Sequence, residues 1–272
     1  MTTAEQAKAK YDQLADRYEE IFFYVADLGE RLVDFARPPR EARTLDVGAG
    51  RGAVARAALA AGCAVTAIDA SPRMVERLVA DHPEITGRTM DAARLEFPDS
   101  SFDLVTAGFV VQILADPAGA LAEAHRVLAP GGTIALSLET QGMGRMTWLQ
   151  DLSTEFFAAA QSAEPTEPSD PTEDTEDTAT GPMTHQHLDA LLEAAGFTGL
   201  AQRSVAMPLT IPDPPALWDW LIPRGLAEAV AVLPPERAEL FHQRFLAEAG
   251  RMHEEGGIIL DFAATLHRAE RR

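Results

Sequence analysis

The sequence predicts an α/β fold: a doubly wound, mostly parallel seven-stranded sheet with helices on its faces and a helical cap. Short apolar runs alternate with helical patterns from about residue 43 to 138, and two further strand patterns follow. A glycine-rich loop, "GAGRG", joins the first strand to the first helix. Such alternation is typical of parallel sheets, in which a helix connects each strand to the next.

The first part of the chain gives these elements in order. "RTLDVG" (43–48) is the first strand, and the helix after it is expected to end at Gly62. "CAVTAID" (63–69) is the second strand, and "SPRMVERLVADH" (71–82) is a helix with Ser71 as its N-cap. The third to fifth strands are "EITGRTMD" (84–91), "FDLVTAGFVV" (102–111) and "GGTIALSLE" (131–139), with a helix that Asp116 and Pro117 open before the fifth.

After Glu139 the pattern is less regular. Helices are expected in "RMTWLQDLSTEFFAAAQ" (145–161) and "THQHLDALLEAAGF" (184–197), and the last two strands in "LAQRSVAMPLTI" (200–211) and "IILDFAATLHRA" (258–269). Residues 163–182 hold seven carboxylates, four prolines and no basic residue. Because such a segment has too few apolar side chains to offset its ordering entropy, we expect a disordered insert there.

These patterns divide the chain into five parts. We expect an N-terminal helical lid (1–40), a ligand-binding core (41–140), a helical cap segment (141–162), the acidic insert (163–182) and a C-terminal part of the core (183–272). The last part contains a proline-broken helical insert over 212–256, which would stand above the sheet edge as a cap.

Composition narrows the function classes. A net charge of −19 with two lysines, Lys8 and Lys10, argues against a nucleic-acid partner, since phosphate contacts need clustered basic residues. No apolar run reaches the roughly 18 residues of a membrane span, and the polar N-terminus lacks the apolar segment of a secretory signal. We therefore expect a cytoplasmic protein, a monomer or a homodimer, whose partner is a small molecule. Its single cysteine, Cys63, is expected to be a buried filler.

The glycine loop leaves two ligand classes open. Gly48, Gly50 and Ala53 fit the G-x-G-x-x-A pattern of dinucleotide sites, and Asp69 follows at a suitable distance. However, Asp46 and Asp91 also stand at the ends of strands, and the carboxyl ends of parallel strands meet in one crevice. Three carboxylates make a poor pyrophosphate site and suit a cation that carries hydroxyls and an amino group.

Four motifs resemble those of the class I S-adenosylmethionine-dependent methyltransferases, in particular the small-molecule branch with quinone and natural-product methyltransferases. The motifs are "LDVGAGRG" (45–52), "AIDASPRM" (67–74), "MDAARLEFPDSSFDLV" (90–105) and "RVLAPGG" (126–132). The resemblance implies S-adenosyl-L-methionine as cofactor, with its ribose hydroxyls on Asp69 and its adenine at Asp91, Ala92 and Met74. "YDQLADRYE" (11–19) resembles the helix that folds over the cofactor in this branch.

The resemblance also gives the expected site. The cofactor contacts would be Tyr11, Tyr18, Asp46, Gly48, Ala49, Gly50, Asp69, Ala70, Met74, Asp91, Ala92, Gly108 and Phe109. The acceptor pocket would include Phe22, Tyr24, Trp148 and Trp218. No metal is expected. The implied reaction is methyl transfer to a small, largely apolar metabolite, in bacterial secondary metabolism.

The catalytic residues stay open. Many relatives carry two histidines after the fourth strand, where this chain has Gln112 and Ile113. Candidate bases elsewhere are His185, His187, His242 and His253, although we expect catalysis mainly by positioning and desolvation.

Two alternatives remain. An NAD(P)-dependent oxidoreductase of the short-chain class needs a Tyr-x-x-x-Lys pair, and no lysine follows Lys10. The other is a non-catalytic S-adenosylmethionine-binding protein, because a fold does not fix a function.

Overall fold

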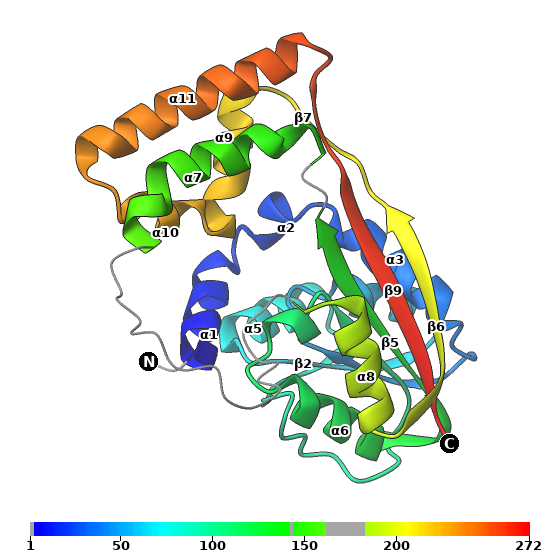
Figure 1. Cartoon of the computed structure of the whole chain (residues 1–272). Coiled ribbons are helices and arrows are strands. Elements are labelled where there is room, and N and C mark those ends of the chain that lie inside the picture. Colours follow the sequence, from blue (N-terminus) through cyan, green and yellow to red (C-terminus); the bar gives the residue numbers. More distant parts are fainter. Residues whose placement is uncertain (1–2, 142–143, 162–182) are drawn as a thin grey trace, which may run out of the picture. The chain divides into compact units, whose positions relative to one another are not determined.

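A computed structural model describes residues 3–141, 144–161 and 183–272 (Figure 1). The acidic insert expected at 163–182 lies outside the described residues. The chain forms two compact units: the first comprises residues 1–140, 182–205 and 264–272, and the second comprises residues 141–181 and 206–263.

The first unit is built on one seven-stranded sheet, with strand order β3-β2-β1-β4-β5-β9-β6. The strands are β1 (Arg43–Val47), β2 (Ala64–Asp69), β3 (Thr86–Thr89), β4 (Phe102–Gly108), β5 (Leu128–Gln141), β6 (Phe197–Ala206) and β9 (Phe262–Arg271). Strands β3, β2, β1, β4 and β5 pair in parallel, whereas β9 runs opposite to β5 and β6 (Figure 1). The predicted doubly wound, mostly parallel sheet is confirmed.

Helices cover this sheet on both faces. They are α1 (Thr3–Leu14), α2 (Tyr18–Ile21), α3 (Val25–Ala36), α4 (Ala53–Ala60), α5 (Pro72–Asp81), α6 (Pro117–Val127) and α8 (His185–Ala194), with a 3₁₀ turn η1 (Val111–Ile113). Two begin as the sequence predicts: the Ser71 hydroxyl accepts from the amide of Met74 at 3.1 Å, and Asp116 accepts from Gly119 at 2.8 Å. These caps fix where α5 and α6 start after the strand-end loops.

The core of this unit lies between the sheet and its helices. Leu45, Val105 and Ile134, from the central strands β1, β4 and β5, belong to one buried apolar cluster. Leu121 of α6 and Leu188 of α8 belong to the same cluster. Burial of these side chains is the main force that holds the strands in place, and it leaves the loops at the strand ends available for binding.

The second unit is mostly helical. It comprises η2 (Gly144–Met146), α7 (Thr147–Gln161), β7 (Leu209–Ile211), α9 (Pro214–Leu221), η3 (Ile222–Arg224), α10 (Leu226–Ala231), α11 (Pro235–Glu254) and β8 (Ile258–Leu260). Phe241 and Phe245 of α11 are fully buried, and their rings contact those of Phe156, Trp148 and Trp218. Aromatic packing therefore makes the core of this unit.

Two predicted strands are interrupted in the structure. The strand expected over 200–211 divides into β6 and β7 at Met207 and Pro208, and the strand expected over 258–269 divides into β8 and β9 at Asp261. Pro208 has no amide hydrogen to continue a ladder, and β7 instead pairs with β8 in a separate two-stranded sheet. Across the described ranges, no helix combines the length and apolarity that crossing a membrane requires.

Candidate functional site

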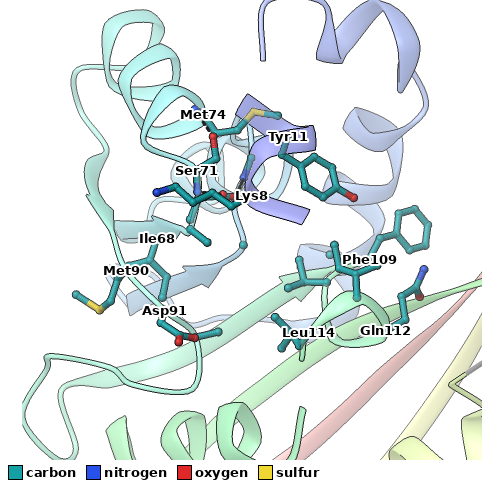
Figure 2. Close-up of a pocket in the computed structure, with 18 of the residues that line it drawn as sticks. Lys8, Tyr11, Ile68, Ser71, Met74, Met90, Asp91, Phe109, Gln112 and Leu114 are labelled. Atoms are coloured by element: carbon teal, nitrogen blue, oxygen red, sulfur yellow. Dashed lines mark hydrogen bonds between the residues drawn. The ribbon is translucent and has the colours of Figure 1, made fainter. Parts of the chain in front are cut away.

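A cavity of about 740 Å³ lies in the first unit, within the range of roughly 300–1,000 Å³ that is typical of small-molecule sites. The loops after β1, β2, β3 and β4 line it, together with residues of α1 to α3 (Figure 2). Strand ends thus supply one part of the wall, and the N-terminal helices supply the other. All the described residues that line this cavity belong to the first unit.

Two glycines of the loop after β1, Gly48 and Gly50, line the cavity. A side chain on Gly48 would collide with Val110, and one on Gly52 would collide with Leu78, so these two glycines allow close packing. Gly50 differs in having more space, because the nearest neighbour of a side chain there would be the ring of Tyr18 at 3.8 Å. With a φ of +53°, Gly50 keeps this wall free of side-chain atoms, as close approach of a ligand to the backbone requires.

Asp69 ties the glycine loop to the start of α5. Its Oδ2 accepts from the amide of Gly50 at 2.8 Å, and its Oδ1 accepts from the amide of Ser71 at 2.8 Å. Burial raises the pKa of Asp69, while these two amides act in the opposite direction. Each carboxylate oxygen has a second lone pair, so the residue can accept further hydrogen bonds from a ligand in the cavity.

The loop after β3 brings a second carboxylate to the cavity. Asp91 accepts from the amide of Ala93 at 2.9 Å, a local turn that orients its side chain. Ala92, Ala70 and Met74 line the cavity with it, and Figure 2 shows Asp91 beside Met90 on the side away from Phe109. These residues form the end of the cavity where the sequence places adenine and ribose.

The expectation that Asp46 joins this crevice is wrong. The side chain is 1% exposed, and Asp46 does not appear among the described residues that line the cavity. Its Oδ1 accepts from the Thr106 hydroxyl at 2.8 Å across the β1–β4 pairing, and no hydrogen bond from the described residues reaches Oδ2. Burial raises the pKa of Asp46 to about 7, against the lowering effect of Thr106 and the Ala55 amide. Ala49 does not line the cavity either.

Aromatic side chains form a continuous wall on the opposite side. Ring centroids lie 6.4 Å apart for Tyr11 and Tyr18, 4.8 Å for Tyr18 and Phe22, 6.4 Å for Phe22 and Tyr24, and 6.3 Å for Tyr24 and Phe109. All five line the cavity, as does Gly108. We call these five residues the aromatic wall. Burial, followed by the charges of Asp69 and Glu139, raises the pKa of Tyr11, which keeps this phenol protonated.

Phe109 holds an unusual backbone conformation at the end of β4. Its φ is +57°, a left-handed value that costs a bulky residue about 1–3 kcal/mol. The Phe109 amide donates to the Ser137 hydroxyl of β5 at 3.0 Å. This bond holds the turn that places the Phe109 ring in the aromatic wall.

Ion pairs join residues 3–21, which comprise α1, α2 and the turn between them and which we call the N-terminal cover, to the core of the same unit. Asp16 pairs with Arg73 at 2.6 Å and with Arg77, both on α5. Asp12 accepts from the Ser71 hydroxyl at 2.5 Å, and Glu19 pairs with Arg56 of α4 at 3.2 Å. All the acidic partners lie on the cover and the basic partners on the core, so their charges are complementary.

The remaining expected site residues lie elsewhere. Of the expected acceptor residues, Phe22 and Tyr24 line the cavity, whereas Trp148 and Trp218 belong to the second unit and pack on Phe245 at 5.3 and 5.1 Å. A role for these two tryptophans at an acceptor stays a prediction.

The four candidate histidines, all within the described residues, do not line the cavity. His185 Nδ1 lies 3.2 Å from His267 Nε2, and His267 Nδ1 lies 3.1 Å from Asp189 Oδ1, in a cluster between α8 and β9. His187 is half-buried on α8, His242 packs on Trp218 at 4.2 Å between ring centroids, and His253 is exposed on α11.

Glu139 and Gln112 are among the cavity residues that the sequence analysis did not assign to the site. Glu139 of β5 lines the cavity, and its amide donates to Oε1 of Gln112 at 3.1 Å. Gln112, from η1, lines the cavity as well. The rule that selected Asp69 and Asp91, an acid at the end of a parallel strand, also applies to Glu139 and would have found it.

Part of the core is similar in sequence to known methyltransferases. Residues 45–136 match the family described as methyltransferase domain. Aklanonic acid methyltransferase DauC of Streptomyces sp. is 36% identical over 142 residues, which are 48% of this chain and 64% of that protein. A malonyl-[acyl-carrier protein] O-methyltransferase of Erwinia pyrifoliae is 33% identical over 134 residues, 49% of this chain and 51% of that protein. The chain thus spans about half to two thirds of these relatives.

A solved structure extends the likeness to the whole fold. The [4+2]-cyclase SpnF has a TM-score of 0.60 and 18% identity, and the match covers 99% of this chain and 97% of that one. At this identity the likeness concerns the fold alone. The family match over the glycine loop and both strand-end acids, within a sheet of this strand order, is the stronger finding. Residues 45–136 are therefore similar to a methyltransferase domain, and this similarity includes the glycine loop and both strand-end acids.

Proposed function

We propose that the protein binds S-adenosyl-L-methionine in the 740 Å³ cavity and methylates a small, largely apolar molecule. The observation that carries this proposal is the meeting of three features in one cavity: the bare backbone of Gly50, the doubly held carboxylate of Asp69, and Asp91. A molecule with a hydroxylated ring, an amino-bearing ring and an extended chain matches such a lining. The aklanonic acid relative supports a role in secondary metabolism.

Each residue has a physical part in this proposal. Asp69 would accept from ribose hydroxyls, Asp91 from the adenine amino group, and the Gly50 backbone would border the methionine part, with Tyr18 opposite it. When bound, the cofactor supplies an electrophilic methyl group on a positively charged sulfur. The aromatic wall excludes water from the acceptor and aligns it, which is the main contribution that such a displacement requires.

A nicotinamide dinucleotide fits this lining less well. Its pyrophosphate carries two negative charges, and Asp69, Asp91 and Glu139 would all face it in the same cavity. Among the described lining residues the basic side chains are Lys8 and Arg94, and neither is part of the glycine loop that would hold the pyrophosphate. The charge of the wall therefore favours the sulfonium cofactor.

Isothermal titration calorimetry tests the cofactor. S-adenosylhomocysteine, the demethylated product, should bind at one site per chain, and NAD⁺ and NADP⁺ should not compete with it. Tighter binding of either dinucleotide would overturn the proposal.

Turnover separates methyl transfer from other uses of the same fold. With S-adenosylmethionine carrying a deuterated methyl group and a library of small metabolites, mass spectrometry should find a labelled product and stoichiometric S-adenosylhomocysteine. Cofactor binding with conversion of an acceptor but no label transfer would favour another reaction, for which the cyclase with this fold is a precedent.

A further inference from the structure

One end of the cavity carries a side-chain amide of which only one polar atom is engaged. The amide belongs to Gln112 of η1, which lines the cavity. Its Oε1 accepts from the backbone amide of Glu139 at 3.1 Å, and this contact fixes the orientation of the group, because only the oxygen of a carboxamide can accept a hydrogen. Within the described ranges, nothing accepts a hydrogen bond from its Nε2. Gln112 therefore offers the cavity a hydrogen-bond donor.

Tyr11 of α1 brings a second donor. Its ring belongs to the aromatic wall, with 6.4 Å between its centroid and that of Tyr18. Figure 2 shows the Tyr11 hydroxyl directed into the cavity, on the side of Gln112 rather than that of Lys8. No hydrogen-bond partner for this hydroxyl occurs among the residues that the structure describes. Burial raises the pKa of Tyr11, so the phenol stays protonated and can donate.

One residue of β5 connects the two donors. The Glu139 amide is bonded to the Gln112 side chain, and the charge of Glu139 contributes to the raised pKa of Tyr11. Phe109 and Leu114 line the same end of the cavity (Figure 2). This end therefore combines two hydrogen-bond donors with an apolar surface. Small-molecule sites typically have such a lining, in which a few polar groups fix the orientation of the ligand.

The two donors select among the groups that a ligand can present. A carbonyl oxygen has two lone pairs and no hydrogen, so it can satisfy both donors at once, whereas an ammonium group has no lone pair with which to accept. A carboxylate would meet the negative charges of Asp69 and Glu139, both of which act on the Tyr11 hydroxyl. The basic side chain of Lys8 lies well apart from Gln112 (Figure 2). A neutral oxygen therefore matches this end best.

We propose that this end of the cavity binds a neutral carbonyl oxygen of the acceptor, as in an aromatic ketone, through Gln112 Nε2 and the Tyr11 hydroxyl. This inference rests on the proposed function and names the substrate class of the same site. The flat apolar part of such a ketone lies against the aromatic wall. The two hydrogen bonds fix the orientation of the acceptor, which is what an in-line displacement requires. Gln112 and Tyr11 thus determine specificity and make no bond to the transferred methyl group.

Matched probes test this inference in an NMR titration of the protein saturated with S-adenosylhomocysteine. Acetophenone carries the carbonyl group, and α-methylstyrene has the same shape with a methylene group in place of the oxygen. Comparison of the two separates hydrogen bonds to the carbonyl from apolar contacts. Benzoate and 1-phenylethylammonium present the charged alternatives, and we expect both to bind more weakly than acetophenone.

Two substitutions at Gln112 locate the first donor. Gln112→Glu keeps an oxygen for the Glu139 amide but removes the hydrogens of Nε2, and Gln112→Met removes both polar atoms. Each should weaken acetophenone binding about three- to tenfold, the effect of losing one hydrogen bond, and leave α-methylstyrene affinity within about twofold. The carbonyl ¹³C resonance of bound acetophenone should also move upfield.

Two further variants complete the test. Tyr11→Phe removes the second donor and keeps the ring, so it should weaken acetophenone binding by a similar factor and spare α-methylstyrene. Ile113→Val is the matched control, because Ile113 lines the cavity next to Gln112 and has no polar atom in its side chain. It should change neither affinity. Unaltered S-adenosylhomocysteine binding shows that the variants of Gln112 and Ile113 are folded.

The outcomes separate this inference from the proposed function. Failure of S-adenosylhomocysteine to bind the wild-type protein would reject the proposed cofactor and this inference with it. The carbonyl acceptor alone is rejected, and the cofactor assignment stands, if acetophenone does not bind the saturated protein or if either charged probe binds more tightly. The same conclusion follows if the Gln112 variants change the affinities of acetophenone and α-methylstyrene equally.

Discussion

The strand-end loops and the N-terminal cover line the same cavity but are held in different ways. In the loops, the Asp69 carboxylate is buried and accepts two backbone amides. The cover is held largely by ion pairs such as Asp16 to Arg73 and Arg77, whose side chains are about half exposed. Buried charged hydrogen bonds resist solvent and salt, whereas exposed pairs contribute little each. We therefore expect the loops to be the permanent part of the site and the cover to be the part that opens more readily.

The largest effect should come from the permanent part. In Asp69→Ala, the Gly50 and Ser71 amides lose their acceptor and the ribose hydroxyls lose theirs. S-adenosylhomocysteine affinity should fall by about 2–4 kcal/mol, or roughly 30- to 1,000-fold, as measured by calorimetry. Asp12→Ala, which removes a contact of the cover to Ser71, should cost far less affinity. Equal losses in the two variants would contradict the distinction between loops and cover.

The buried carboxyl group of Asp46 should make the free energy of unfolding depend on pH. Its pKa of about 7 exceeds the ordinary value, so between about pH 4 and 7 the folded state holds a proton that the unfolded state has lost. Stability contributed by this group is therefore present at low pH and lost as the pH rises toward 7. Asp46→Asn, which cannot ionise, should be more stable than the wild type at pH 8 by roughly 4 kcal/mol, and equal to it near pH 4, in urea unfolding.

The carboxyl group of Asp103 should change stability with pH in the opposite direction, so this residue serves as the control. Its bonds to Arg43 lower the pKa of Asp103, so its contribution to stability is present at neutral pH and lost as the pH falls through that lowered value. Asp103→Asn should reduce stability at pH 8. A pH-independent effect of Asp46→Asn would contradict the assigned burial of that charge.

Removing ion pairs of the N-terminal cover should have a smaller effect, on the rate at which S-adenosylhomocysteine dissociates. Asp16→Asn removes its pairs with Arg73 and Arg77, so S-adenosylhomocysteine should dissociate about two- to fivefold faster in stopped-flow measurements at low salt. The difference from the wild type should vanish at about 1 M salt, where exposed charges are screened. Asp27→Asn is the matched control, because its pair with Arg31 is equally exposed but lies within α3. Equal acceleration in both variants would exclude the cover as the cause.

The smallest effect on cofactor binding should come from the second unit. Trp218→Ala removes ring contacts with Phe245 and His242 and should lower the melting temperature of the protein. Its S-adenosylhomocysteine affinity should stay within about twofold of the wild type, since Trp218 lies outside the residues that line the cavity. Tyr18→Ala, which removes a ring of the aromatic wall, should lower that affinity clearly. A large loss in Trp218→Ala would contradict the independence of the two units in cofactor binding.

The strand-end acids show how far sequence reasoning reaches. Asp69 is the last residue of β2, and Asp91 follows the end of β3, so both project beyond the sheet toward the cavity. Asp46 is the penultimate residue of β1, and its side chain lies over the sheet against Thr106. Because side chains alternate along a strand, an error of one residue in the position of a strand end reverses such an assignment.

Other features depend on contacts that no local pattern contains. The ring of His125 on α6 is half-buried and packs on Phe197 of β6 with 5.0 Å between ring centroids, and burial lowers its pKa. The breaks at Pro208 and Asp261 follow from β7 pairing with β8 across about fifty residues. Periodicity finds helices and strands, whereas such long-range pairings arise only in the packed chain.

The position of β9 between β5 and β6 has a consequence for the order of folding. It is the seventh strand of the sheet along the chain, yet it is the neighbour that joins β6 to the rest. Until β9 arrives, β6 has no partner in this sheet, and the apolar surface between β5 and β6 stays open to solvent. Closing the gap joins residues far apart in sequence, which is slow because loop entropy opposes it. We therefore expect the chain to be most prone to aggregation before β9 pairs with β5 and β6.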